Sequence, residues 1–95
     1  MLFCIHGIDA ADAMPRRMEH YDGHRAHLAK AEGMGVRIVM SGPLVADDGQ
    51  TPMGSLLIVE AESRAAVETY QHADPFYIAG IWEKFTITAF KKMIG

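Results

Sequence analysis

The chain has 95 residues, of which 49% are hydrophobic and 22% are charged, an ordinary composition for one globular domain. This length excludes a two-domain enzyme, and so small a domain buries only about 60–70% of its unfolded surface, so we expect it to pair with a second copy. Nine basic and twelve acidic residues give a formal net charge of −3. Binding to nucleic acid, which depends on neutralising phosphates, is therefore disfavoured.

The N-terminal stretch from Met1 to Ile8 is apolar but contains His6 and is closed by Asp9. It has neither a basic leader nor a cleavage site, so we expect no signal peptide, no membrane span and a cytoplasmic protein. The single cysteine, Cys4, lies in this stretch and is interpreted as a small buried hydrophobe.

The first predicted elements are a strand and a long helix. Residues 2–8 are apolar on both alternating faces, which is typical of a central strand. A helix is predicted from Ala13 to about Glu32, with Asp12 as its cap. Its apolar stripe, interpreted as core, contains Met14, Met18, Tyr21 and Leu28.

A hairpin is predicted next. The β-branched run 36–40 predicts a strand that Ser41-Gly42-Pro43 interrupts and that Leu44 and Val45 continue briefly. A turn cluster at 46–52 leads to the partner strand within 54–61.

The last two elements are a short helix and a strand. Ser63 is a suitable N-cap for a helix that ends before Asp74-Pro75. Residues 82–90 alternate between apolar and polar side chains, as in a strand with one wet face.

The order strand, helix, strand, strand, helix, strand predicts an α+β fold: a ferredoxin-like βαββαβ sandwich with a four-stranded antiparallel sheet, spanning residues 1–95 as a single domain. Two helices cover only one sheet face, and the other face carries apolar side chains that a second subunit would cover. We therefore expect a homodimer in the form of a dimeric α/β barrel, with a small cavity at the rim of each subunit between the first helix and the sheet.

Three of the five histidines, His20, His24 and His27, fall within a roughly 60° arc of the first helix. They predict either a polar flank bordering a pocket or a metal or haem site. No HExxH motif and no cysteine cluster supports the metal alternative, so we predict no metal and no cofactor.

His27 and Asp74 are the predicted catalytic pair. Ferredoxin-like topology returns the chain after the second helix towards the first, which brings these two side chains near each other. A carboxylate that binds an imidazole fixes the ring tautomer and makes the ring a competent general acid or base. Asp74 also precedes Pro75, as an N-cap does, and one carboxylate can serve both roles.

Substrate-binding candidates come from the hairpin. Gly42 and Pro43 mark a kink in the strand where a ligand can approach closely. The Ser55 hydroxyl is a candidate for a hydrogen bond to a substrate oxygen, or else satisfies the local backbone. Ser55 has no nucleophile-elbow context, so no Ser-His-Asp triad is expected.

Several short motifs together resemble the YCII-related (YciI-like) family over nearly the whole chain. They are His27-Leu28-Ala29-Lys30, Ser41-Gly42-Pro43-Leu44, Gly54-Ser55-Leu56-Leu57-Ile58, Ala73-Asp74-Pro75-Phe76 and Phe90-Lys91-Lys92. The resemblance implies a dimeric barrel with a His and Asp pair, carried onto His27 and Asp74. The family's Gly-Pro and Gly-Ser elements fall on Gly42, Pro43 and Ser55, and we predict substrate contacts at these three residues and at His24 and Phe76. The arginine that often stands three residues before the histidine is His24 here, with Arg25 beside it.

The resemblance implies a small acid–base enzyme, because one branch of the family is described as a dehydrochlorinase of chlorinated hydroxylated aromatics. Similar barrels include lactone isomerases and cofactor-free oxygenases. We therefore expect a cofactor-free lyase or isomerase acting on a small cyclic or hydroxylated compound. The alternative is a dimeric module that binds a small ligand without converting it.

Overall fold

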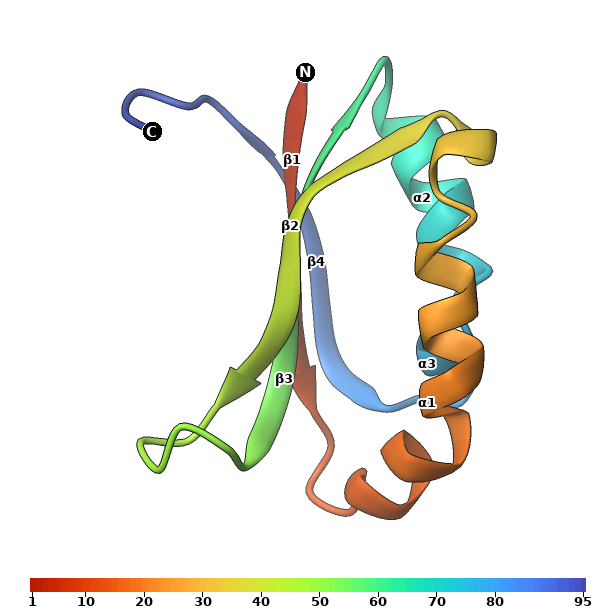
Figure 1. Cartoon of the computed structure of the whole chain (residues 1–95), viewed down its shortest axis with the longest axis vertical. Coiled ribbons are helices and arrows are strands. Elements are labelled where there is room, and N and C mark those ends of the chain that lie inside the picture. The colour runs from red at the N-terminus through yellow and green to blue at the C-terminus, as the bar shows by residue number, and fades with distance from the viewer.

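The computed structural model describes residues 1–95 and contains one antiparallel sheet with all of its helices on one face (Figure 1). The strands lie in the order β2-β3-β1-β4. The elements are β1 (Leu2–Asp9), α1 (Met14–Leu28), a 3₁₀ turn η1 (Glu32–Met34), β2 (Val36–Val45), β3 (Pro52–Ala61), α2 (Arg64–His72), α3 (Pro75–Ile78) and β4 (Trp82–Phe90). The predicted ferredoxin-like α+β fold, with β1 in the centre of the sheet, is confirmed.

Helix α1 is shorter than predicted and lacks the predicted cap. It ends at Leu28, and a turn leads to Gly35, whose positive φ of 79° suits glycine and redirects the chain into β2. Its N-cap residue is Ala13, and Asp12 instead forms an ion pair with Arg16 at 3.4 Å. The predicted extension of this helix to Glu32 and its capping by Asp12 were therefore wrong.

Both predicted caps after β3 are present. The Ser63 hydroxyl accepts a hydrogen bond from the backbone N–H of Ala66 at 3.2 Å at the start of α2. Asp74 Oδ1 accepts the backbone N–H of Phe76 at 2.9 Å and caps α3, which begins with Pro75.

Strand β2 runs without a break from Val36 to Val45, so the predicted interruption at 41–43 was wrong. The register shifts instead between Ile38 and Met40 and again between Leu44 and Val45. Pro43 remains within the strand and lies opposite Ser55 of β3, on the side of the sheet edge that faces α1.

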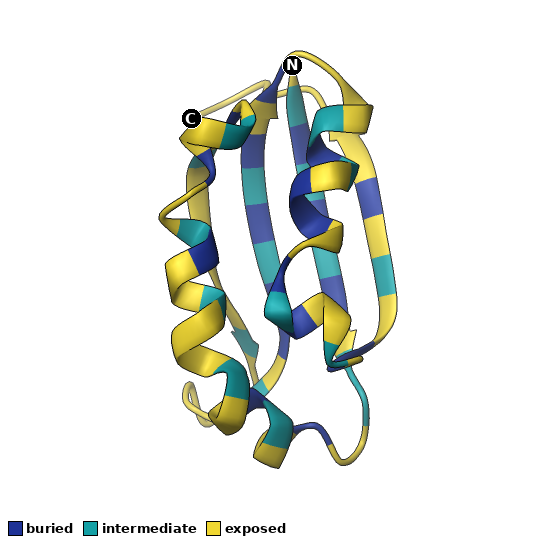
Figure 2. Ribbon diagram, turned by 90° about the vertical axis from the view of Figure 1, so that its right-hand side faces the viewer, coloured by how far each residue is buried: buried dark blue, intermediate teal, exposed yellow.

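The core lies between the helices and one face of the sheet. Buried and half-exposed residues alternate along the central strands (Figure 2). The main cluster comprises Phe3, Ile5, Ala31, Val36, Leu57, Val59, Ala61, Val67, Tyr70 and Ile87, and a second comprises Ala13, Phe76, Ile81 and Trp82. No helix is long and apolar enough to cross a membrane.

Candidate active site

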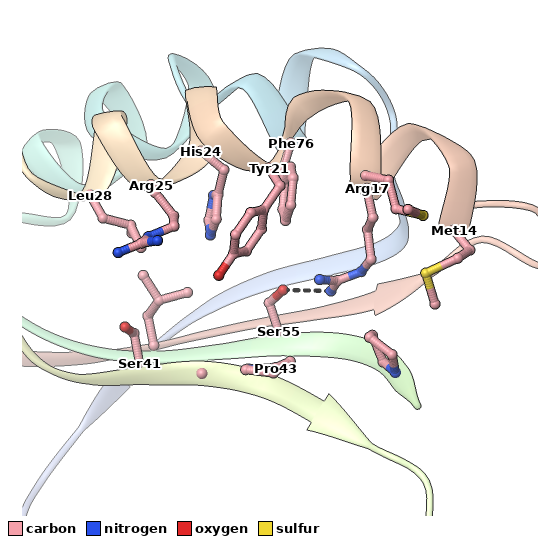
Figure 3. Close-up of a pocket in the computed structure, with 14 residues that line it drawn as sticks. Met14, Arg17, Tyr21, His24, Arg25, Leu28, Ser41, Pro43, Ser55 and Phe76 are labelled. Atoms are coloured by element: carbon pink, nitrogen blue, oxygen red, sulfur yellow. Dashed lines mark hydrogen bonds between the residues drawn. The ribbon is translucent and has the colours of Figure 1, made fainter. Parts of the chain in front are cut away.

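A cavity of about 490 Å³ opens between α1 and the β2–β3 edge of the sheet (Figure 3). This is the place at which the sequence predicted a rim cavity. The helix contributes Arg17, Tyr21 and His24, and the sheet contributes Ser41, Gly42, Pro43 and Ser55, with Phe76 of α3 behind them. Its volume falls in the range of small-molecule sites.

The apolar stripe of α1 lines this cavity instead of the core. Met14 is 40% exposed and Met18 is 75% exposed, and both border the cavity together with Tyr21 and Leu28. The interpretation of this stripe as core was therefore wrong for Met14, Met18 and Tyr21, whereas Leu28 also packs against the main core cluster. The adjacent side of α1 carries His24 and His27, which contact Asp74 and α2.

His24 and Asp74 form a hydrogen-bonded pair at the cavity. His24 Nδ1 lies 2.9 Å from both carboxylate oxygens of Asp74, which is 0% exposed. The imidazole ring stacks on Phe76, with centroids 4.0 Å apart and planes 2° from parallel. Asp74 thus binds His24 and caps α3 with the same carboxylate. The contacts leave the other ring nitrogen of His24, Nε2, without a protein partner, and the ring points into the cavity (Figure 3).

His27 does not contact Asp74, so the predicted hydrogen bond between these two residues was wrong. Its side chain turns towards α2, where Nε2 lies 2.7 Å from the carbonyl oxygen of Tyr70. The Tyr70 hydroxyl in return donates to the carbonyl oxygen of His27 at 3.2 Å, and the two rings stack at 4.4 Å. His27 is only 7% exposed and does not line the cavity. It belongs to a structural clamp between α1 and α2.

Tyr70 is held in its neutral form by its surroundings. Burial, and secondly the charge of Asp74, raise the pKa of Tyr70 well above its usual value. A neutral phenol keeps the proton that it donates to His27, so the clamp persists at ordinary pH.

Arg17 is a buried residue of the site that sequence reasoning missed. Its Nε lies 2.5 Å from Asp9 Oδ2, and its Nη2 donates to the Gly54 carbonyl at 2.7 Å and to Ser55 Oγ at 2.9 Å. Its guanidinium also lies 5.1 Å from the centroid of the Phe76 ring. The available signal was that Arg17 shares a helix face with Met14 and Tyr21, since a core face does not accept an unpaired arginine.

The cavity lining carries cations and no carboxylate. Arg17 is paired with Asp9, whereas Arg25 forms no ion pair and lies 5.8 Å from the Tyr21 ring. Arg25 directly follows His24, which occupies the position where the family resemblance often has an arginine. Arg25 thus provides a cation one residue further along the helix. A ligand with negative or electron-rich oxygens fits this lining better than a cationic one does.

The three histidines of α1 do not converge on one point. His24 binds Asp74, His27 binds Tyr70, and His20 lies 3.9 Å from Glu19. No group of three or more His, Cys, Asp or Glu side chains is arranged to hold a metal ion.

The remaining predicted binding residues all lie at the cavity. His24, Gly42, Pro43, Ser55 and Phe76 line it, and Asp74 stands behind His24. Their roles towards a ligand stay predictions.

Comparison with known proteins agrees with this architecture. The YCII-related domain matches residues 1–91. The chain belongs to the YCII-related family. Protein YciI from Escherichia coli is 34% identical to it over 98 residues, covering 98% of this chain and 99% of that protein. YciI from Shigella flexneri matches to the same extent.

Among solved structures, 5-chloro-2-hydroxyhydroquinone dehydrochlorinase (TftG) from Burkholderia phenoliruptrix, in complex with 2,5-dihydroxybenzoquinone, has a TM-score of 0.83 to this YCII-related chain. It is 31% identical, and the match covers 96% of this chain and 94% of TftG. Rv0793 from Mycobacterium tuberculosis has a TM-score of 0.52 at 12% identity, covering 99% of this chain and 97% of its own, and shows a shared fold alone.

Proposed function

We propose that this YCII-related protein is a cofactor-free lyase of the dehydrochlorinase type that acts on a small hydroxylated ring compound. His24 is the catalytic acid and base, and Asp74 is its positioning residue. The observation that carries the proposal is the His24–Asp74 pair at the wall of the cavity. The similarity to TftG over nearly the whole chain supports the reaction class.

The pair sets the direction of proton transfer. When Asp74 accepts the Nδ1–H of a neutral imidazole, the lone pair is on Nε2, which faces the cavity. Nε2 then takes a proton from the substrate and returns it at another atom. Stacking on Phe76 holds the ring plane while this happens.

The proposed reaction removes hydrogen chloride without an oxidant. A ring hydroxyl of a chlorinated hydroxyhydroquinone gives its proton to His24 and becomes a carbonyl, and the displaced electron pair takes a proton at the carbon that bears chlorine. A second hydroxyl then loses its proton and becomes a carbonyl, and the electron pair it releases breaks the carbon–chlorine bond. The net loss is one proton and one chloride ion, and the product is a hydroxyquinone.

The cavity lining suits such a compound. Tyr21 provides aromatic surface, and Arg25, which forms no ion pair, provides positive charge towards oxygens that lose protons. Arg17 also lines the cavity, but its charge is balanced by the ion pair with Asp9.

The first test is chloride release from 5-chloro-2-hydroxyhydroquinone by the purified protein without added cofactor. His24→Asn keeps a donor towards Asp74 in place of Nδ1 but removes Nε2, so turnover should fall by about 100- to 10,000-fold. His20→Asn, on the same helix and outside the cavity lining, is the matched control and should retain activity. A compound that binds and is recovered unchanged would overturn the enzyme proposal in favour of the binding module.

We also propose that the protein is a homodimer in which a second copy covers the open face of the sheet. Figure 1 shows helices on one face only, and the other face carries Cys4, His6, Leu56 and Ile58, which are half-buried in the single chain. A second copy is the self-complementary partner for such an apolar face. A cytoplasmic location stays a prediction.

A further inference from the structure

Arg25 is a cation at the cavity that has no partner within the protein. It lines the cavity but forms neither an ion pair nor a side-chain hydrogen bond. The nearest acidic residue along α1, Asp22, lies three positions earlier and does not pair with it. Figure 3 shows the Arg25 guanidinium opposite Ser41 of β2, at the end of the cavity away from Met14. The positive charge of Arg25 is therefore available to a ligand.

From this we infer that Arg25 binds an anionic substituent of the ligand, so that the site selects a hydroxylated ring compound that carries an acidic group, such as a carboxylate, outside the ring. The inference rests on the proposed function, which places the ring in this cavity, and deepens it by naming the substrate class. The proposed reaction needs only hydroxyl oxygens on the ring, whereas Arg25 adds a second point of recognition.

The two arginines of the cavity differ in how their charge is balanced. Asp9 binds the guanidinium of Arg17 through both carboxylate oxygens and neutralises it. Arg25 has no such partner, and no residue that lines the cavity is acidic. Of the two arginines, only Arg25 thus carries a charge that the protein leaves unbalanced. A ligand with a full negative charge gains most by placing that charge at Arg25.

The helix sets these two cations at different ends of the cavity. Arg17 and Arg25 are eight residues apart, which corresponds to about 12 Å along the axis of α1. His24 directly precedes Arg25, and its ring points into the cavity (Figure 3). A ring compound held against His24 therefore has Arg25 beside it, and a short substituent is enough to reach the guanidinium.

Neighbours on the helix keep the Arg25 side chain at the cavity. Its guanidinium carbon lies 5.8 Å from the centroid of the Tyr21 ring, one turn earlier, within the range of a cation–π contact. Leu28, three positions later, also lines the cavity and packs against the main core cluster. A guanidinium over an aromatic face keeps the N–H groups at its edge free, and these form two parallel hydrogen bonds with a carboxylate.

A purely structural role for Arg25 makes a different prediction. The residue lies in the last turn of α1, where a cation stabilises the helix through its dipole. If that were its only role, Arg25→Gln would lower the Tm and leave the preference among ligands unchanged. Under the inference, the variant loses its preference for an anionic ligand, while its Tm falls by about 5 °C or less.

Two probes of the same size and shape isolate the effect of the charge. 3,4-Dihydroxybenzoate carries a carboxylate at neutral pH, and 3,4-dihydroxybenzamide has an uncharged planar amide in its place. In isothermal titration calorimetry at low salt, the wild type should bind the acid about five- to thirtyfold more tightly than the amide. Arg25→Gln should remove this preference. Arg25→Lys, which keeps the charge but loses the forked pair of donors, should retain part of it.

Lys30→Gln is the matched control. It removes the same unit of charge just after the end of α1, and Lys30 is exposed and outside the cavity lining. This variant should prefer the acid as strongly as the wild type does, because an exposed charge at a distance is screened. A wild type that binds the acid no more tightly than the amide, or binds neither probe at millimolar concentration, overturns the inference. A preference that survives in Arg25→Gln also overturns it.

Failure of the proposed function is separable from failure of this one. If the wild type prefers the acid through Arg25 but releases chloride neither from 5-chloro-2-hydroxyhydroquinone nor from a chlorinated 3,4-dihydroxybenzoate, the anion site stands and the enzyme proposal falls. If chloride is released and His24→Asn abolishes the release while the acid and the amide bind equally well, the anion site falls and the enzyme proposal stands.

Discussion

His24 and His27 lie one helical turn apart, and the structure predicts that replacing them has opposite consequences. His27→Leu removes the bond from Nε2 to the Tyr70 carbonyl and the stacking of the two rings. The carbonyl keeps one partner, the N–H of Ala73 at 3.3 Å, so losing the hydrogen bond costs about 1–2 kcal/mol. Losing the stacked pair costs about 0.5–1.5 kcal/mol more.

The sum of about 1.5–3.5 kcal/mol corresponds to a fall in Tm of about 7–18 °C for a domain of this size. Chloride release by His27→Leu, assayed well below its Tm, should stay within about threefold of the wild type. His24→Asn should show the reverse, with turnover lost and Tm lowered by about 5 °C or less, because only the stacking on Phe76 is given up.

Differential scanning calorimetry and a chloride assay on the same preparations measure both effects. The reasoning is refuted if His27→Leu melts like the wild type but is inactive, while His24→Asn is active. That result would return the catalytic role to His27, where the family resemblance first put it.

Three further outcomes are expected. Ile58→Glu, which puts a charge on the open sheet face, should give a monomer in sedimentation experiments, whereas Ile78→Glu, on the exposed side of the helix layer, should not change the assembly. Tyr70→Phe should lower the free energy of unfolding by about 1 kcal/mol near neutral pH, because the hydrogen bond to the His27 carbonyl is lost. Folding raises the pKa of Tyr70 above its usual 10.0, so the stabilisation by the protonated hydroxyl is fully present below pH 10 and is lost as the pH rises towards the folded-state pKa. In urea denaturation, the difference in unfolding free energy between wild type and Tyr70→Phe should therefore become smaller above pH 10. Gln71 is fully buried with both amide atoms unpartnered, so Gln71→Met should keep or raise the free energy of unfolding, and a loss above about 1 kcal/mol would contradict this.

The fold was predictable because each element carries its own local signal. The alternating pattern in residues 82–90 predicts both ends of β4 correctly. The helix caps predicted at Ser63 and Asp74 both form their hydrogen bonds in the structure. Local hydrogen bonds of this kind depend on neighbouring residues alone, so the sequence contains all that they need. The bulge in β2 between Ile38 and Met40 has no such signal, because it is set by pairing with β3.

The choice between His24 and His27 was not predictable in the same way. Both histidines lie on the same side of α1, so helical periodicity identifies the face but not the partner. The partner depends on how far along the axis of α1 the Asp74 carboxylate and the Tyr70 carbonyl come to rest. That position is a product of tertiary packing between α1 and the α2–α3 pair.

The apolar stripe of α1 shows the same limit. Side chains that line a cavity and side chains that fill a core give the same spacing of Met14, Met18 and Leu28, and only the total composition of the face separates the two cases. Arg17 and Arg25 lie on that face, and two arginines beside an apolar stripe indicate a lined cavity and not a packed core.

The site follows from contacts along one side of this helix. Gly23 lies against Pro75, where a Cβ would come within 3.3 Å of the proline ring, and the neighbouring His24 meets the Asp74 carboxylate. Seven residues earlier, and therefore on nearly the same side of the helix, Arg17 reaches the sheet and donates to Ser55. The imidazole of His24 and the hydroxyl of Ser55 thus lie at opposite walls of the cavity, and both are positioned before a ligand enters.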